Sequence, residues 1–217
     1  GDEIGIYYVG TDGEFYDEIS NRKLDFEEVV KARLAEMRQI AEHGVYQKVP
    51  LSQCWEETGK APIKVRWLDI NKGDELNMDY RSRLVAKEIK TDKRTDLFAA
   101  TPPLEAKKIL FSAAVTEGVG YSEGNRKGGM KIDFIDVRRA YFHATCKRDV
   151  YVELPGEDAE EGMCGELDKS MYGARDAAQN WEATYVEFME ALGFQRGKAS
   201  PCVFIHSKRK MRAVIHG

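Results

Sequence analysis

Residues 130–143 read Met130-Lys-Ile-Asp-Phe-Ile-Asp-Val-Arg-Arg-Ala-Tyr-Phe-His143, an apolar stretch followed by a carboxylate and aromatic rings. The first part predicts a β-strand that ends at Asp136, with Tyr141 five positions further on. A carboxylate at a strand end can hold Mg²⁺ against a phosphate, because this hard ion takes oxygen ligands and usually only one or two protein carboxylates. The alternative is a plain strand that happens to end in aspartate.

Three further motifs surround this run. They are Tyr80-Arg-Ser-Arg-Leu-Val-Ala-Lys87 upstream, and Asp149-Val-Tyr-Val-Glu-Leu-Pro155 and Leu167-Asp-Lys-Ser-Met-Tyr-Gly-Ala-Arg-Asp-Ala-Ala-Gln-Asn-Trp181 downstream. In this order and at these separations, the four motifs resemble the reverse transcriptase of copia-type retrotransposons. The likeness runs from about Val45 to the last residue. Each motif alone could arise by chance, so it is the common order that makes the resemblance specific.

The resemblance implies an α+β fold, namely the fingers and palm of a reverse transcriptase with an antiparallel palm sheet packed by helices. We expect the palm sheet to contain strands at Lys131–Asp136 and Met211–Ile215. Finding these two strands in different sheets would refute the resemblance. The fold is expected to be incomplete at its C-terminus.

The N-terminal part is expected to be separate from this domain. Residues 1–23 are rich in Gly and Asp and predict a poorly ordered linker. Asp25 can cap an amphipathic helix that ends before Gly44, because apolar residues follow it at helical spacing. We therefore divide the chain into residues 1–44, a lead-in segment with its helix, and residues 45–217, a partial reverse transcriptase domain.

Alternating residues predict a β-hairpin across the turn signal Asn71-Lys-Gly-Asp74. Arg81, Arg83 and Lys87 share one parity of the second strand and should project from one face. Guanidinium groups bind phosphate oxygens in bidentate fashion, so this face suits a triphosphate. A solvated strand face is the alternative. The resemblance implies that a fingers arginine grips the incoming nucleotide, and it leaves open whether this is Arg81 or Arg83.

The resemblance also implies a metal site. Asp136 matches the catalytic, metal-binding aspartate of the family, and the backbone carbonyl of Val137 is the expected second ligand. The expected cofactor is Mg²⁺, with Mn²⁺ as an alternative. Asp133 would face the other side of the same strand. Tyr141 matches an aromatic gate that excludes the 2′-hydroxyl of a ribonucleotide; without the resemblance it would be an ordinary core aromatic.

The last motif is expected to line the template and nucleotide pocket. The resemblance implies that the turn at Tyr172 and Gly173 packs against the base pair, and that Arg175 and Lys87 contact nucleic acid. Asp176 departs from the family, in which glutamine is common at this position. An acid near the path of the nucleic acid weakens electrostatic attraction, so this departure puts processivity in doubt.

The composition of the chain limits which partners and metal sites can be expected. A net charge of −4 argues against a general polyanion binder. Residues 60–131, however, carry 15 basic and 10 acidic side chains, which predicts either a local phosphate-facing surface or a solvated mixed-charge face. The four cysteines are too widely spaced for a Cys-x2-Cys metal pair and predict reduced thiols in an intracellular protein. No stretch approaches the roughly 20 apolar residues of a membrane span, so no membrane partner is expected.

The resemblance implies an RNA-directed DNA polymerase in the parent protein, acting on an RNA template, a DNA primer and deoxynucleoside triphosphates. The parent would be a polyprotein of the Gag-Pol type with integrase upstream and ribonuclease H downstream. Its expected location is a cytoplasmic virus-like particle, with the nucleus as a second compartment. Two alternatives stay open: a non-catalytic nucleic-acid-binding or protein-binding relic of such an element, and an unrelated α+β domain.

The two ends of the chain lead to a further expectation. The chain begins at Gly1 and stops at Gly217, where the resembling enzymes continue with the paired aspartates of the metal site. Phosphoryl transfer needs positioned metal ions, and one carboxylate cannot hold two ions in the required geometry. We therefore expect a fragment of a longer polyprotein that is inactive as a polymerase by itself.

Overall fold

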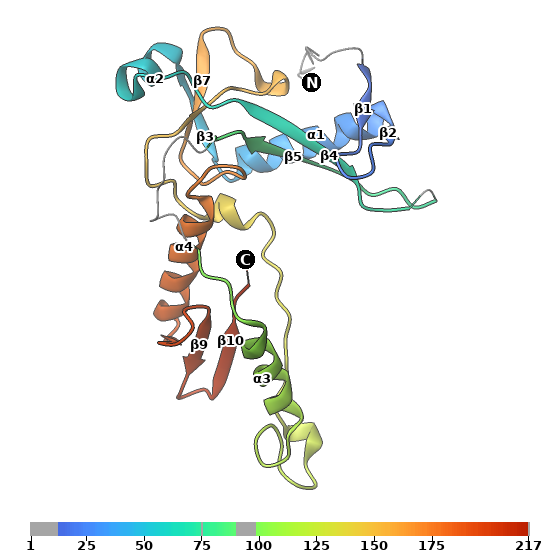
Figure 1. Ribbon diagram of the computed structural model, residues 1–217, viewed down its shortest axis with the longest axis vertical. Helices are drawn as coiled ribbons and strands as arrows, with labels where there is room; N and C mark the ends of the chain where they lie inside the picture. Colours follow the sequence, from blue (N-terminus) through green and yellow to red (C-terminus); the bar gives the residue numbers. More distant parts are fainter. Residues whose placement is uncertain (1–12, 75, 90–98, 217) are drawn as a thin grey trace. The chain divides into compact units, whose positions relative to one another are not determined.

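A computed structural model describes residues 13–74, 76–89 and 99–216 and combines helices with β-sheets (Figure 1). This mixture is compatible with the predicted α+β class. The chain divides into two compact units: residues 1–95 with 141–181, and residues 96–140 with 182–217. The expected boundary after residue 44 lies inside the first unit. In the described part of the chain, no helix has both the length and the apolar character that a membrane crossing requires.

The first unit holds three small antiparallel sheets among its described residues, with the strand orders β1-β2, β3-β7-β6 and β4-β5. Its elements are β1 (Phe15–Tyr16), β2 (Lys23–Leu24), α1 (Phe26–Glu42), β3 (Tyr46–Pro50), α2 (Leu51–Thr58), β4 (Val65–Asn71), β5 (Tyr80–Ala86), most of the 3-10 turn η3 (Ala140–His143), β6 (Tyr151–Val152), the 3-10 turn η4 (Gly156–Asp158), β7 (Met163–Leu167) and the first residues of α4 (Ala177–Ala191).

The predicted hairpin is confirmed as β4 and β5. Their register runs from Val65 opposite Ala86 to Asn71 opposite Tyr80. Side chains alternate across a strand, and accordingly Ser82, Leu84 and Ala86 of β5 are buried, whereas Arg81 and Arg83 are exposed. Lys87, directly after the strand, is exposed as well. One face of β5 therefore carries cations and the other faces the core.

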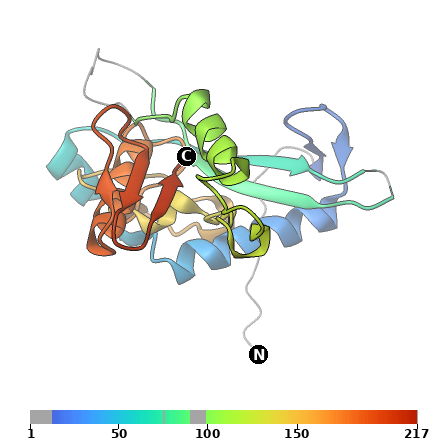
Figure 2. The same ribbon diagram turned by 90° about the horizontal axis from the view of Figure 1, so that it is seen from below.

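Helix α1 confirms the amphipathic helix predicted after Asp25. The carboxylate of Asp25 accepts a hydrogen bond from the backbone N–H of Glu28, which satisfies one of the free donors of the first turn. Val29 and Ile40 are buried on one side of the helix. Figure 2 shows α1 running along the β4–β5 hairpin, and the helix packs on β5.

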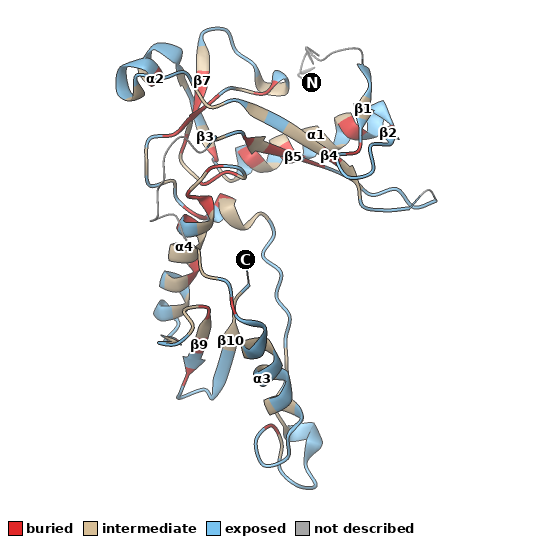
Figure 3. Ribbon diagram, viewed as in Figure 1, coloured by how far each residue is buried: buried red, intermediate tan, exposed pale blue. Residues whose placement is uncertain are grey.

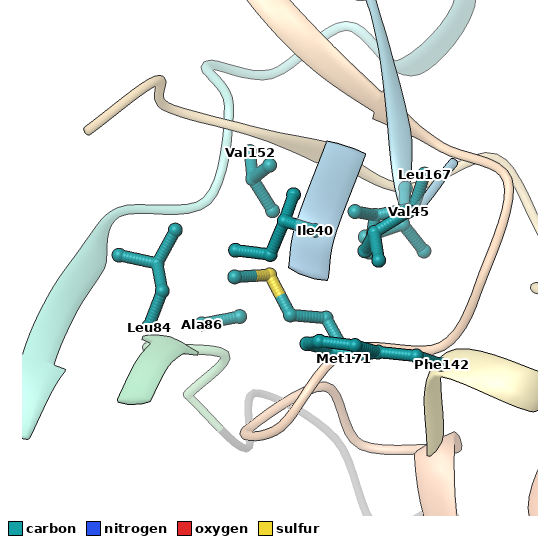
Figure 4. Close-up of a cluster of buried hydrophobic side chains, with 9 residues drawn as sticks. Ile40, Val45, Leu84, Ala86, Phe142, Val152, Leu167 and Met171 are labelled. Carbon is teal, nitrogen blue, oxygen red and sulfur yellow. The ribbon is translucent and has the colours of Figure 1, made fainter. Parts of the chain in front are cut away.

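The main hydrophobic core of the first unit lies between α1, β5 and the β3-β7-β6 sheet (Figure 4). Full burial of such a side chain contributes about 1.5–3 kcal/mol. Two of its members are Phe142 in η3 and Met171 directly before Tyr172, and both neighbour predicted site residues, so the core also fixes those segments. The buried members are Ile40, Val45, Leu84, Ala86, Phe142, Val150, Val152, Leu167 and Met171.

A buried ion cluster ties α1 to the hairpin and to η4. The guanidinium of Arg33 donates to both carboxylate oxygens of Asp69, at 3.2 and 2.6 Å, and to Glu157 at 3.3 Å. Ser82 donates to Asp69, and the indole N–H of Trp67 donates to Glu157. The carboxylates are thereby paired and hydrogen-bonded, which is the condition under which buried charge is tolerated.

Residues 13–23 form ordered structure, so the prediction of a poorly ordered linker was wrong for them; residues 1–12 lie outside the described part. Strand β1 pairs with β2. Between them, the carboxylate of Asp17 accepts hydrogen bonds from the backbone N–H groups of Ile19, Ser20 and Asn71, the last from β4. One carboxylate thus closes the turn and anchors the segment to the hairpin.

Hydrogen bonds from the backbone of Ser20 and Asn71 lower the pKa of Asp17 from 3.8 to about 2. A carboxyl whose pKa is lower in the folded state contributes stability above its ordinary pKa and loses it as the pH falls toward the folded value. We expect Asp17→Asn to lower the free energy of unfolding by roughly 1–2 kcal/mol at pH 7, and by much less near pH 2. Urea unfolding at both pH values measures this, with the exposed Glu56→Gln as control. Similar losses for the two variants at pH 7 would contradict the assignment.

The second unit contains α3 (Leu104–Val115), the 3-10 turn η2 (Arg126–Gly128), the later part of α4, and strands β8 (Gln195–Arg196), β9 (Val203–His206) and β10 (Met211–Val214). The strands form one antiparallel sheet with the order β10-β9-β8. The strand expected at Met211–Ile215 is confirmed as β10, and it pairs with β9 with Met211 opposite His206.

Residues 131–137 form no strand, so the predicted palm strand at Lys131–Asp136 was wrong, as was its pairing with Met211–Ile215. Among the described strands, β10 pairs with β9 alone. Phe134 and Ile135 are 82% and 86% exposed, and Figure 3 shows the segment before η3 as exposed. An apolar stretch favours a strand, but a strand also needs a neighbouring strand that pairs with its backbone N–H and C=O groups.

Candidate functional site

The end of β5 is joined to the turn at Tyr172 and Gly173. The backbone N–H of Ala86 donates to the carbonyl of Tyr172 at 2.7 Å. Gly173 has a φ of +84°, and a Cβ at this position would lie 2.0 Å from the carbonyl oxygen of Ala86. Both the left-handed backbone and the close approach require glycine. The predicted glycine turn is thus present, and it is docked on the cationic strand.

Three predicted site residues come together at this junction. The guanidinium carbon of Arg83 lies 5.2 Å from the ring centre of Tyr172, within the range of a cation–π contact. The ring centres of Tyr172 and Tyr141 are 4.8 Å apart. The neighbouring Phe142 is buried in the core and contacts Tyr172 with its ring. A cation and two half-buried phenol rings therefore share one surface.

The other cations of β5 are arranged differently. The guanidinium of Arg81 forms an ion pair with Asp79 at 2.8 Å, on the exposed side of the hairpin. Arg83, in contrast, lies over an aromatic ring. The backbone N–H of Lys87 donates to the carbonyl of Lys64, which fixes the main chain while the side chain stays exposed. The alternation of side chains along a strand predicted that the three cations project from one face. The structure shows that each of them has different surroundings.

A second polar network joins the residues that follow the turn at Gly173 to the residue Glu88 that follows β5. The guanidinium of Arg148 donates to both carboxylate oxygens of Glu88, at 2.9 and 2.7 Å, and to Asp176 at 2.8 Å. Glu88 also accepts a hydrogen bond from the backbone N–H of Arg175 at 2.8 Å. Asn180 donates to the other oxygen of Asp176. This network holds the segment after Gly173 against the end of β5.

The structure corrects the expectation for Asp176. Its carboxylate is buried and paired with Arg148, so it does not face the nucleic-acid path as an uncompensated acid. Burial by itself would raise the pKa of this carboxyl, but the hydrogen bond and the positive charge of Arg148 outweigh burial and lower it. Neither Arg148 nor Glu88 was singled out from the sequence, because long-range ion pairs leave no local pattern.

Removal of Arg148 should leave two carboxylates partly buried without their cation. We expect Arg148→Met to lower the free energy of unfolding at pH 7 by roughly 3 kcal/mol. Because the pKa of Asp176 is lowered in the folded state, its ion pair with Arg148 stabilises the fold above the ordinary carboxyl pKa. This stabilisation is lost as the pH falls through the lowered pKa. The measurement is urea unfolding at pH 7 and pH 3.

The matched control is Arg66→Met, because Arg66 pairs with Glu18 where both side chains are nearly half exposed. An exposed pair of this kind contributes about 0–1 kcal/mol. Equal losses for the two variants would show that the Arg148 network adds nothing beyond a surface ion pair.

Asp136 and Val137 belong to the second unit, whereas Arg81, Arg83, Lys87, Tyr141, Tyr172, Gly173 and Arg175 belong to the first. Asp136 is exposed, and so is Asp133. In the described ranges no three His, Cys, Asp or Glu side chains are grouped so that they could hold a metal ion. The carboxylate of Asp136 and the carbonyl of Val137 are oxygen donors of the type that Mg²⁺ takes. They would supply part of a coordination shell.

Comparison with known proteins adds an independent line of evidence. The sequence model of a family described as reverse transcriptase (RNA-dependent DNA polymerase) matches residues 53–216. A Retrovirus-related Pol polyprotein from transposon TNT 1-94 of Nicotiana tabacum is 25% identical over 185 residues. The alignment covers 82% of this chain and 13% of that polyprotein, so the chain spans a small part of its relative. No solved structure matches.

Proposed function

Because the chain belongs to the reverse transcriptase (RNA-dependent DNA polymerase) family, we propose that it supplies fingers and palm residues of a copia-type RNA-directed DNA polymerase. The observation that carries this proposal is the grouping of Arg83, Tyr172 and Tyr141 beside the Gly173 turn. A guanidinium suits the phosphates of a nucleotide, and aromatic faces suit its base and sugar. The reaction would be attack of a primer 3′-hydroxyl on the α-phosphate of a deoxynucleoside triphosphate, with pyrophosphate leaving.

Within this site we assign the nucleotide-gripping role to Arg83 and not to Arg81. Arg83 is exposed and lies over the ring of Tyr172, the residue against which the base pair would pack. Arg81 is engaged by Asp79. Lys87 and Arg175 flank the same junction in sequence and would contact the nucleic-acid backbone, where each neutralised phosphate adds salt-dependent affinity.

For the chemical step we propose Asp136 and the carbonyl of Val137 as ligands of Mg²⁺, with Mn²⁺ as a substitute. When bound, such ions neutralise the charge that spreads over the transferring phosphate. Tyr141, whose ring packs against Tyr172, would exclude a 2′-hydroxyl by its bulk. The resemblance implies that paired aspartates complete the metal site.

The missing strand at Lys131–Asp136 does not count against family membership. Pairing of this segment with Met211–Ile215 was the wrong criterion, because the family match extends across both segments independently of their secondary structure.

The parent protein would be a Gag-Pol type polyprotein with integrase and ribonuclease H segments. Its substrates would include an RNA template and a DNA primer, and its location would be a virus-like particle.

Replacement of Asp136 tests the metal site. In a chain extended into the rest of its polyprotein, Asp136→Asn should reduce Mg²⁺-dependent primer extension on an RNA template by a factor on the order of 1,000, because a charge and a ligand are lost together. Asp133→Asn is the matched control and should have a small effect. Equal losses would mean that the wrong carboxylate has been assigned. An extended wild-type chain that binds nucleic acid but extends no primer would favour the non-catalytic relic.

Replacement of Tyr141 tests sugar discrimination. In the same extended chain, Tyr141→Ala should open space beside the 2′-carbon and raise the use of ribonucleotides relative to deoxynucleotides by about tenfold or more. The ratio of kcat/KM for the two sugars measures this. Tyr141→Phe keeps the ring and should keep the preference. If Tyr141→Ala leaves the ratio unchanged, the residue is only a packing aromatic.

A further inference from the structure

Two cysteines come together in a second, smaller hydrophobic core of the first unit. Cys54 of α2 and Cys164 of β7 are each 1% exposed, and they pack with Tyr151 of β6. A hydrogen bond joins the two thiols. All four cysteines of the chain are free, so the pair is in its reduced form.

The packing of α2 on the sheet holds the two thiols together. Helix α2 packs against β3 and β7, and β7 is the central strand of the β3-β7-β6 sheet (Figure 1). The phenol of Tyr151 donates to Glu57 of α2 at 2.6 Å, and the Nε2 atom of Gln53 donates to the phenol oxygen at 3.3 Å. The position of Cys54 over Cys164 is therefore fixed by contacts that do not involve sulfur.

The other two cysteines have different surroundings. The thiol of Cys146 donates to the backbone carbonyl of Arg148 at 3.3 Å. Cys202 belongs to the second unit, and its thiol donates to the carbonyl of Ala100 at 3.1 Å. Cys146 and Cys202 thus face backbone carbonyls, and they serve as internal controls for the pair.

The pair is protonated at neutral pH. Burial raises the pKa of the Cys164 thiol to about 11, and the neighbouring Cys54 adds to this shift. Cys54 also donates to the carbonyl of Lys60 at 3.3 Å. The hydroxyl of Thr58 donates to the same carbonyl, so this oxygen keeps a partner when Cys54 loses its proton. Two neighbouring thiols still need an oxidant before they can form a bond.

We propose that Cys54 and Cys164 form a modification site, at which hydrogen peroxide converts the two thiols into a disulfide that cross-links α2 to β7. One thiol loses its proton and attacks a peroxide oxygen; the O–O bond breaks, a sulfenic acid forms, and the departing hydroxide takes the proton to give water. The second thiol attacks the sulfenic sulfur, and the hydroxyl leaves with the second proton. Two thiols and one peroxide thus give one disulfide and two waters.

A small oxidant can reach the pair when α2 opens locally. The helix has 8 residues, and its N-cap Pro50 makes no side-chain hydrogen bond to the first turn. Leu51 and Trp55 on the same helix are partly exposed. Short helices with unsatisfied terminal groups and few buried contacts open at a low free energy. Once formed, the disulfide would close the segment between Cys54 and Cys164 and thereby restrict the unfolded chain.

Peptide mapping of residues 1–217 tests the proposal. The chain is treated with hydrogen peroxide, the remaining thiols are alkylated, and tryptic peptides are analysed by mass spectrometry without reduction. We expect a disulfide-linked pair of peptides 49–60 and 149–169, which carry Cys54 and Cys164, and no cross-linked peptide that carries Cys146 or Cys202. The midpoint of thermal unfolding should rise by roughly 5–10 °C and return to its original value after reduction.

Cys54→Ala and Cys164→Ala should each abolish the linked peptides and the rise in midpoint. Cys146→Ala is the matched control and should keep both. If an alanine variant does not fold, the peptide map of the wild-type chain still decides. The proposal is overturned if peptides 49–60 and 149–169 are recovered separately, as alkylated thiols or as sulfinic acids, or if the cross-linked chain unfolds at the midpoint of the reduced chain.

The outcome is independent of the proposed polymerase function. Neither thiol belongs to the group of Arg83, Tyr172 and Tyr141 that carries that proposal, and the test measures no nucleotide incorporation. A chain that forms the disulfide and an extended chain that extends no primer would leave this proposal standing while the polymerase function fails.

Discussion

The guanidinium of Arg33 is the point on which the first unit depends. It is held by Asp69 of β4 and by Glu157 of η4, and the rings of Phe15 and Trp67 lie 4.4 and 5.1 Å from its central carbon. Removal of one partner from a buried cluster of this kind typically costs 3–5 kcal/mol, because the remaining charges stay desolvated. Since its partners come from distant parts of the sequence, one side chain fixes the helix, the hairpin and η4 relative to each other.

Strand β5 connects the Arg33 cluster to the candidate site, so the contacts that fix the strand also fix the site. Ser82 donates to Asp69 within the cluster, and Leu84 and Ala86 on the same face enter the core. Their alternation directs Arg83 to the opposite face. At the end of the strand, Ala86 holds the carbonyl of Tyr172, and Glu88 is held by Arg148. The surface formed by Arg83, Tyr172 and Tyr141 is therefore preorganised by buried groups that never touch a substrate.

The second unit contrasts with this arrangement. Helix α3 has no buried residue, and Ile109 and Val115 are 67% and 72% exposed (Figure 3). The segment with Phe134 and Ile135 is also exposed. Its apolar residues predicted a strand, yet its backbone pairs with none of the described strands. Apolar patterning is therefore left unsatisfied in α3 and in this segment, whereas Tyr185, Phe194, Cys202 and Phe204 of the same unit are buried.

The sequence by itself determined the elements whose signals are local: the capped helix after Asp25, the alternation along β5, the glycine turn at Gly173 and the strand at Met211–Ile215. The order of four motifs also determined the family. Only the tertiary structure decided that residues 13–23 are anchored by Asp17, that Asp176 is neutralised by Arg148, and that Lys131–Asp136 is not a strand. The reason is physical: caps, alternation and turns depend on neighbours in sequence, whereas ion pairs and strand pairing depend on residues that only folding brings together.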